Sequence, residues 1–362
     1  MKKKVLIILD SYKYSKKEDA IRDKIASLCR PSFFYTDYEN RTITFFHGLK
    51  FVGNFLSHVT YWAISFFLAL KLFVSKQRAE ITIFINPIVG FFYCLLLSLL
   101  HRDENVCLAG FIFEEKNSSL YLALRKRFVK FAYRKVSHLI VYSSEEVDKY
   151  SAIFPSLADK ITFSRYGRDF NIFGENEYHT TEKYVASGGA SNRNFDTLVE
   201  AMSILEKKDP QILCRIATRP SAFSIKHQLE NLEVLTDIRM ATFGSFLERS
   251  SFVIIPILDN SISAGHMALL EAMYRQKVVI ATDLAAIRDY ADEEQVYLYR
   301  ANDSRELAEI IEHVYANIDS DEVQDKALAA KTKYDEEYTF NQFVYRLVEK
   351  CIRLNNRDSN EE

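Results

Sequence analysis

The stretch that decides the fold runs from Ser251 to Asp283 and reads SFVIIPILDNSISAGHMALLEAMYRQKVVIATD. The apolar run Phe252–Ile257 is short enough for a buried parallel strand. A polar loop follows it, and the residues after Gly265 carry apolar side chains at helical spacing. Val278–Ala281 is a second β-branched strand. The stretch therefore predicts a strand–loop–helix–strand unit whose loop leads into a helix N-terminus. Free N–H groups and the positive dipole end at such a terminus suit a phosphate or diphosphate.

Strands alternate with helices on both sides of this stretch. The strands that we predict are Val5–Leu9, Ser32–Tyr35, Thr42–Phe46, Ile81–Ile85, Val106–Phe113, His138–Tyr142, Ile161–Ser164, Tyr184–Ser187, Ile212–Ala217, Leu232–Leu235 and Val296–Tyr299. Helical patterns separate most of them. This alternation predicts an α/β protein with two Rossmann-like domains, each a parallel sheet with helices on both faces.

Polar composition and turn residues suggest where one domain ends and the next begins. We expect the following division of the chain: a first domain at 1–169, a linker at 170–182, a second domain at 183–337, a final helix at 338–354 and a charged, disordered tail at 355–362. The 362 residues are enough for two domains of ordinary size.

Composition and charge restrict the class of protein. Apolar residues make up 48% and charged residues 27% of the chain, as in globular proteins. Residues 1–180 carry 26 Lys and Arg against 18 Asp and Glu, whereas residues 181–362 carry 21 against 31. This asymmetry indicates that only the first half faces an anionic surface. Five widely spaced cysteines without zinc spacing predict free thiols in a reducing cytosol, and we expect no nucleic-acid partner.

Three segments of the first half bear on membranes. Val59–Val74 and Ile88–Leu100 are nearly continuous apolar runs, but both are shorter than the ~18–20 residues of a spanning helix. We expect a pair of buried helices there. Leu120–Val136 combines cationic and aromatic residues in a basic amphipathic helix. Such a helix fits an anionic membrane surface, and the alternative is a solvated basic helix with a packed apolar side.

Ligands of open parallel sheets bind beyond the carboxyl ends of the strands. In the second half these ends present the loops 188–193, 218–219, 259–266 and 282–283. They supply glycines for close backbone approach, arginines for phosphate and a helix N-terminus, which is the composition of a nucleotide-diphosphate site. No Gly-x-x-x-x-Gly-Lys-Ser/Thr and no Gly-x-Gly-x-x-Gly occurs, which argues against a P-loop NTPase and a dehydrogenase.

The segments Leu269–Met273 and Val278–Asp283, continued by Ile287–Tyr290, resemble the nucleotide-sugar site of retaining GT-B glycosyltransferases. These belong to the large family-four type that builds bacterial polysaccharides and glycolipids. The loop and helix at Gly188–Ala201 are similar to the family's phosphate-binding segment. The likeness is specific over most of residues 183–317. It implies that the sheets of the two domains face each other across a cleft, with the donor in the second domain, the acceptor in the first and the last helix crossing back.

The resemblance assigns roles to individual residues. Glu271 matches the second Glu of the family's Glu-x7-Glu element, which holds the ribose hydroxyls, whereas the first Glu falls on Ser263. Arg193 matches a phosphate-binding cation. A second cation is replaced by Gly188-Gly189, so we take Gly189 as a close-approach position and Arg219 as a substitute cation or a structural ion pair. Asp289 replaces a commoner Glu.

Gly265 and His266 stand at the loop–helix junction that would face the sugar and the diphosphate. We take Ser263 and His266 as candidate catalytic residues and Gly265 as part of the phosphate site. His266 donates a hydrogen bond to the ligand in one interpretation and is a cap or packing residue in the other.

The function that these patterns favour is a cytoplasmic, retaining, metal-independent hexosyltransferase without a cofactor. It would move a sugar from a UDP- or GDP-type donor to a saccharide or lipid-linked saccharide, at the inner face of the plasma membrane if 120–136 binds lipid. Two alternatives remain: a non-catalytic GT-B-like subunit that stabilises an active partner, which Ser263 favours, and a nucleotide-sugar epimerase, whose acidic and His residues we do not find in the crevice.

Overall fold

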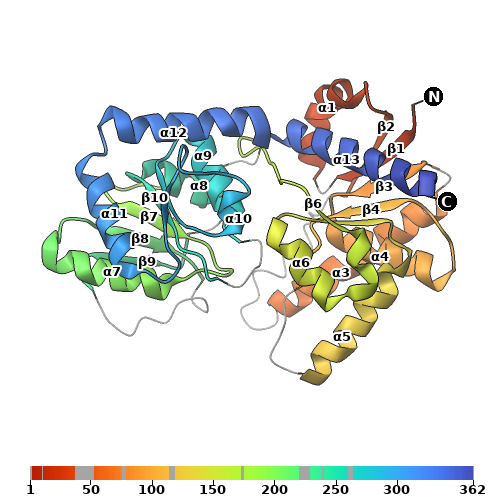
Figure 1. Cartoon of the computed structure of the whole chain (residues 1–362), viewed down its shortest axis with the longest axis horizontal. Coiled ribbons are helices and arrows are strands. Elements are labelled where there is room, and N and C mark those ends of the chain that lie inside the picture. The colour runs from red at the N-terminus through yellow and green to blue at the C-terminus, as the bar shows by residue number, and fades with distance from the viewer. Residues whose placement is uncertain are drawn as a thin grey trace. The chain divides into compact units, whose positions relative to one another are not determined.

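The computed structural model describes residues 2–9, 11–36, 53–75, 79–113, 119–172, 175–219, 229–238, 240–259 and 264–361. The predicted strand Thr42–Phe46 and the candidate catalytic residue Ser263 lie outside these ranges. The chain divides into two compact units: unit 1 contains Met1–Ser164 and Val344–Glu362, and unit 2 contains Arg165–Phe343. Figure 1 labels the elements of each unit.

Unit 1 is built on one parallel sheet. Its strands are β1 (Lys4–Leu9), β2 (Arg30–Tyr35), β3 (Ile81–Phe84), β4 (Val106–Ala109), β5 (His138–Val141) and β6 (Ile161–Phe163). Their order is β2-β1-β3-β4-β5-β6, and every described pairing is parallel. The strand order reverses between β1 and β3. Open α/β sheets bind their ligands at the carboxyl edge of such a reversal point.

Helices and helical turns of unit 1 connect these strands. They are η1 (Tyr12–Lys17), α1 (Glu18–Ile25), α3 (Gly53–Val74), α4 (Pro87–Leu99), α5 (Ser119–Ala132), η2 (Tyr133–Lys135), α6 (Ser144–Ile153) and η3 (Pro155–Lys160). Local sequence explains where they begin. Asn86 accepts hydrogen bonds from the amides of Ile88 and Val89, both at 3.2 Å, and Pro87 occupies the first turn of α4.

Unit 2 has a second parallel sheet. Its strands are β7 (Val185–Gly188), β8 (Cys214–Ala217), β9 (Leu232–Leu235), β10 (Val253–Ile255), β11 (Val279–Thr282) and β12 (Tyr297–Tyr299). The order is β12-β11-β10-β7-β8-β9, again with parallel pairings. The helices are α7 (Phe195–Lys208), α8 (Met240–Arg249), α9 (His266–Tyr274), α10 (Ala285–Arg288), α11 (Ser304–Ala316), α12 (Asp321–Lys333), the π-helical turn η5 (Tyr334–Tyr338) and the start of α13 (Phe340–Glu361).

The core of unit 2 follows from the two-residue alternation of its strands. Ile254 of β10 packs on one face of the sheet with side chains of α7 and α11. Val253 and Ile255 point to the opposite face and pack with α9. Helices therefore cover both faces of the sheet, as Figure 1 shows. The predicted α/β fold with two Rossmann-like parallel sheets is confirmed.

The two apolar runs of unit 1 differ from the expected pair of buried helices. α4 is buried along one side, including Val89, Cys94 and Leu97. α3 is only partly buried, with Trp62 and Phe67 among its exposed side chains. Apolar composition alone does not state how many neighbours cover a helix, so the expectation was wrong for α3. None of the helices in the described part of the chain is long and apolar enough to cross a membrane.

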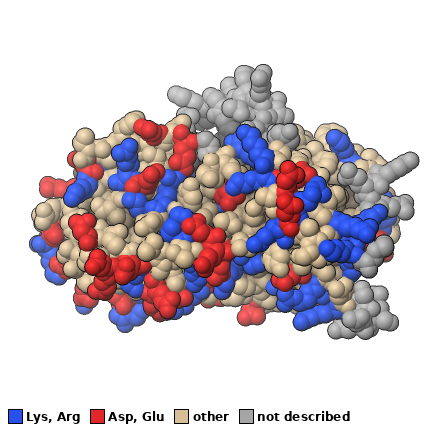
Figure 2. All heavy atoms as spheres, turned by 90° about the horizontal axis from the view of Figure 1, so that it is seen from above, with Lys and Arg blue, Asp and Glu red and all other residues tan. Residues whose placement is uncertain are grey.

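The observed division of the chain differs in detail from the expected boundaries. It falls at 164/165, and Phe170, which we expected in a linker, is buried beside Tyr274 and Tyr334 in unit 2. α13 continues to Glu361, into the stretch expected to be a disordered tail, because its helical pattern is not interrupted by Gly or Pro. Unit 1 is thus formed from two separate pieces of chain. Lys and Arg are dense over unit 1 and Asp and Glu over unit 2 on the face seen in Figure 2, in line with the sequence asymmetry.

Candidate functional site

The candidate site of unit 2 lies at the carboxyl ends of its two central strands. β7 and β10 are neighbours, and the chain continues from β7 to β8 on one side and from β10 to β11 on the other. This is the point at which the strand order reverses, where open α/β sheets bind their ligands. The loops that leave β7 and β10 therefore begin side by side.

Backbone contacts join the two loops. They involve three residues of each loop: Asn192, Arg193 and Asn194 with Pro256, Ile257 and Leu258. The amide of Leu258 donates to the carbonyl of Asn192, and the amide of Asn194 donates to the carbonyl of Pro256, both at 3.1 Å. Asn194 also caps α7 by accepting from the amide of Thr197 at 3.3 Å. The position of Arg193 is thus fixed by both strands and by a helix start.

Arg193 folds back over its own loop. Its Nε donates to the carbonyl oxygen of Gly188 at 2.8 Å, and its Nη1 donates to that of Ser191 at 3.0 Å. Gly189 has φ +109°, and a Cβ there would stand 2.6 Å from Nη2 of Arg193. Burial lowers the pKa of Arg193 to about 10, which leaves the guanidinium charged at neutral pH. The loop needs glycine at 189 both for its backbone angle and for this contact.

The other loop leads to the N-terminus of α9. Gly265 is the N-cap residue, with φ +81°, and a Cβ there would lie 2.5 Å from Cδ1 of Ile257. The first amide bonded within the helix is that of Leu269, which donates to the carbonyl of Gly265 at 2.9 Å. The preceding N–H groups belong to the first turn, where the helix dipole is positive. A glycine cap without a side chain leaves room for an anion to approach them.

His266 is the first residue of α9, and two tyrosines hold its ring. The ring stacks on Tyr290, with centroids 5.7 Å apart and planes at 15°, and meets Tyr166 edge-on at 5.6 Å. The backbone amide of Tyr166 donates to the hydroxyl of Tyr290 at 2.9 Å, which fixes the pair. Burial lowers the pKa of His266 to about 4, and the positive charge of Arg193 contributes to the shift. The imidazole is therefore neutral near pH 7, and Arg193 acts on it electrostatically.

Glu271 lies further along α9 with 16% of its side chain exposed. Its carboxylate faces the guanidinium of Arg275, one turn later, at 3.5 Å. Burial raises the pKa of Glu271 above its usual value, while Arg275 opposes the rise. Arg275 is shared with Glu175 and with Glu248, the latter at 2.7 Å. Glu271 is therefore one acidic member of a four-residue charge network.

Gly244 of α8 lets this network approach closely. A Cβ at Gly244 would stand 2.6 Å from Oε1 of Glu271. The network therefore packs against the glycine of a neighbouring helix, and a larger residue at position 244 would displace it.

The structure thus places Gly189, Arg193, Gly265 and His266 at one reversal point, with Glu271 further along α9. Arg219 follows β8 and is exposed, and its neighbour Thr218 donates to the carbonyl of Gly189 at 2.7 Å. Asp283, at the end of β11, forms an ion pair with Arg288 at 2.9 Å.

Three residues that contact the predicted set were not singled out as site residues from the sequence. Tyr166 and Tyr290 enclose His266, and neither is near it in the chain, so no local spacing pointed to them. Arg275 had a readable signal, since it stands four residues after Glu271 on the same helix face. Among the described residues, no group of three or more His, Cys, Asp or Glu is arranged to hold a metal ion.

Comparison with known proteins finds a family match within the second unit. Residues 182–317 match the family described as "Glycosyl transferases group 1". No curated protein matches the chain. The matched segment covers β7 to α11 and includes Gly189, Arg193, Arg219, Gly265, His266 and Glu271, whereas Tyr166 and Glu175 precede it.

Solved structures of similar fold cover almost the whole chain. A glycosyltransferase from Rickettsia africae has a TM-score of 0.56 at 11% identity, covering 98% of both chains. The Anabaena protein HepE in complex with UDP-glucose has a TM-score of 0.59 at 13% identity, covering 97% of this chain and 99% of its own. Sucrose-phosphate synthase from Thermosynechococcus elongatus has a TM-score of 0.58 at 12% identity, covering 98% and 100%. The family match and the fold together support a glycosyltransferase of the GT-B class.

Proposed function

We propose that the protein transfers a sugar from a nucleotide-diphosphate sugar to an acceptor hydroxyl. The observation that carries this proposal is the junction of two loops at the strand-order reversal of unit 2, where Arg193 and the N-terminus of α9 meet within the segment that matches the glycosyltransferase family. The similar fold of HepE, solved with UDP-glucose, adds support for a nucleotide-sugar donor.

Each residue has a role in this proposal. Arg193 and the first N–H groups of α9 bind the diphosphate, since a fixed cation and a helix dipole both attract phosphate oxygens. Glu271 accepts hydrogen bonds from the two ribose hydroxyls. Neutral His266 donates a hydrogen bond to the sugar or the phosphate from its position between Tyr166 and Tyr290. Arg219 is a second cation that reaches the diphosphate from the end of β8.

The chemical step follows from these charges. The bond between the anomeric carbon and the β-phosphate oxygen breaks, and a bond from the acceptor oxygen forms on the same face of the sugar. The acceptor proton passes to the departing diphosphate. Arg193 and the α9 N-terminus stabilise the negative charge that develops there, which is the contribution a metal ion makes in other enzymes. The proposal is therefore a retaining, metal-independent hexosyltransferase.

The acceptor is proposed to be a saccharide or a lipid-linked saccharide used in cell-surface polysaccharide or glycolipid synthesis. Support comes from α5, whose apolar residues Leu120 and Leu124 are exposed beside its cations. That arrangement favours the membrane-surface interpretation of 120–136 over a packed helix. Serine replacements of Arg125, Lys126 and Arg127 should abolish flotation of the protein with anionic liposomes. Unchanged flotation would contradict the proposed membrane binding of this helix.

The central experiment incubates the protein with a panel of UDP- and GDP-sugars and measures both donor binding and released nucleotide. We expect one donor to bind and to release nucleotide, and Glu271→Ala to remove both. Glu248→Ala is the matched control, because Glu248 pairs with the same Arg275 but has 61% of its side chain exposed. Loss of binding in Glu248→Ala alone, or no binding of any donor, would contradict the proposal.

A second candidate is a non-catalytic subunit that binds a nucleotide sugar or stabilises an active partner. Two features favour this candidate: Glu271 already forms an ion pair with Arg275, and position 263 is a serine. In that case a donor binds without nucleotide release, with or without an acceptor. An epimerase would instead convert the donor sugar without releasing nucleotide, which chromatography of the recovered donor detects.

A further inference from the structure

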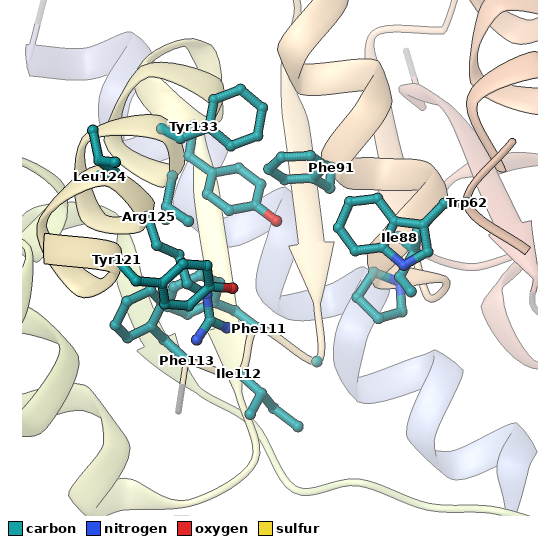
Figure 3. A pocket seen from close by; sticks show the side chains of 14 residues that line it. Trp62, Ile88, Phe91, Phe111, Ile112, Phe113, Tyr121, Leu124, Arg125 and Tyr133 are labelled. Atoms are coloured by element: carbon teal, nitrogen blue, oxygen red, sulfur yellow. The ribbon is translucent and has the colours of Figure 1, made fainter. Parts of the chain in front are cut away.

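Unit 1 contains a pocket of about 660 Å³, and no residue of the candidate site in unit 2 lines it. It lies at the carboxyl ends of β3 and β4, lined by Pro87 and Ile88 after β3 and by residues 110–113 after β4. This edge adjoins the reversal point between β1 and β3, and the volume is within the ~300–1,000 Å³ of small-molecule sites. Figure 3 shows Trp62 and Phe91 on one side of the pocket and Tyr121 and Arg125 of α5 on the other.

The base of the pocket is rigid and aromatic. Phe111 and Phe113 are buried, and the amide of Phe113 donates to the hydroxyl of Tyr150 at 3.1 Å. Tyr133 packs edge-on against Phe91 and Phe111, with centroids 5.6 Å apart in both pairs. Rings that are fixed by one another keep an apolar cavity open instead of collapsing into it.

The mouth of the pocket is apolar as well. Trp62, Ile112, Leu124 and Phe128 all line it, and about half of each side chain is exposed, from 47% for Trp62 to 59% for Leu124. Exposed apolar side chains that surround a cavity mark a binding site for apolar material. Trp and Tyr at such a mouth are the residues that favour the boundary between hydrocarbon and water.

One cation stands at this otherwise apolar site. The guanidinium of Arg125 lies over the ring of Phe113, 4.4 Å from its centroid, and Arg125 lines the pocket. The rest of α5 adds Lys126, Arg127 and Lys130 and no acidic residue. A ligand that satisfies both features has a hydrocarbon chain and an anionic head.

We propose that this pocket binds the hydrocarbon chain of a phosphate-bearing membrane lipid, with the lipid phosphate at Arg125. Charge complementarity favours this occupant over an apolar peptide, since four cations without an acid on α5 select an anionic amphiphile. That this lipid is the acceptor of the sugar rests on the proposed function. Binding of the chain itself does not.

Trp62 is the one tryptophan of the chain, so its fluorescence reports occupancy directly. We would titrate the protein with decyl phosphate below its micelle concentration, with 1-decanol and with inorganic phosphate. Decyl phosphate should shift Trp62 emission to shorter wavelength with a saturable curve. 1-Decanol should bind at least about tenfold more weakly, because it lacks the charged contact, and phosphate alone should give no shift.

Three variants test the assignment, each with its fold checked by circular dichroism. Leu124→Glu places a charge at the mouth and should weaken decyl phosphate by more than about tenfold. Arg125→Gln should lower the affinity for decyl phosphate about tenfold and leave the affinity for 1-decanol unchanged. Lys130→Gln removes the same charge from the same helix outside the pocket lining and should bind as the wild type.

Equal binding of decyl phosphate and 1-decanol, or wild-type binding by Leu124→Glu, would overturn the proposal. The absence of any saturable shift would overturn it in favour of a protein partner for this surface. UDP and GDP binding is measured on the same preparations. Intact nucleotide binding without lipid binding refutes the pocket alone, and the reverse result refutes the donor site of unit 2 alone.

Discussion

Gly189→Ala is the substitution that tests the donor site most directly. The new Cβ would meet three atoms of the Arg193 guanidinium, at 2.6 Å from Nη2 and 2.9 Å from both Cζ and Nε. The guanidinium is the end of a long side chain, so it can move, but only by giving up its bonds to the carbonyls of Gly188 and Ser191. The backbone adds a cost of about 1–3 kcal/mol, because φ +109° is a conformation that alanine rarely adopts.

The same substitution should also lower the affinity of the protein for nucleotide. If Arg193 binds the diphosphate, its displacement removes a charged hydrogen bond of about 1.5–3 kcal/mol, which corresponds to a loss of roughly ten- to a hundredfold in nucleotide affinity. Isothermal titration with UDP and GDP measures this directly. Gly110→Ala is the matched control: Gly110 also follows a strand, has φ +79°, and would place its Cβ 3.2 Å from Tyr142 of unit 1. It should lower stability and leave nucleotide affinity unchanged.

A double-mutant cycle decides whether the effect passes through Arg193. Gly189→Ala combined with Arg193→Gln should bind nucleotide as weakly as Arg193→Gln alone, because the two changes remove the same contact. Additive losses would refute this reasoning, as would wild-type affinity in Gly189→Ala.

Three further predictions give independent checks. Glu271→Gln should lower the affinity for UDP or GDP by about tenfold or more, yet leave the affinity for the 2′,3′-dideoxy nucleotide unchanged. Titration calorimetry measures both affinities. His266 has its pKa lowered from 6.5 to about 4, so the unfolded chain binds more protons between these values; stability is full above pH 6.5 and falls towards pH 4 by about 3 kcal/mol. Urea unfolding at pH 7 and pH 5 should show about 2 kcal/mol of that fall in the wild type and a smaller fall in His266→Gln. Gly265→Ala should lower the free energy of unfolding by about 2 kcal/mol, from its positive φ and its contact with Cδ1 of Ile257, and Ile257→Val should restore part of the loss in chemical denaturation.

The order of strands and helices followed from the sequence because buried parallel strands are short continuous apolar runs, whereas helices carry apolar side chains with a period of about 3.6. The residues from Phe252 to Ala281 illustrate this, since their apolar runs became β10, α9 and β11. The junction at Gly265 was also predictable, because a glycine between a strand and an amphipathic helix supplies the positive φ that a tight entry into the helix requires.

Contacts between distant segments were not predictable in the same way. Tyr166 and Tyr290 enclose His266 from positions 100 residues before it and 24 after it, and no period links them. Exposure was equally hidden: the apolar sequence of α3 predicted burial, yet Trp62 became part of a pocket mouth. The candidate residue Ser263 lies outside the described residues, so its role stays a prediction.

The separation of unit 1 into two pieces of chain affects how the protein is made. Val344, Leu347 and Val348 of α13 are buried, and Lys3 bonds Asn355 at 2.6 Å, so the last turns of the chain complete the domain that its first residues begin. A ribosome delivers residues 1–164 and then all of unit 2 before the part of α13 that belongs to unit 1, from Val344 on, is made. Until then the apolar surface of residues 1–164 that α13 covers is exposed. A chain that stops near residue 343 would contain every strand of both sheets and still lack a finished first domain.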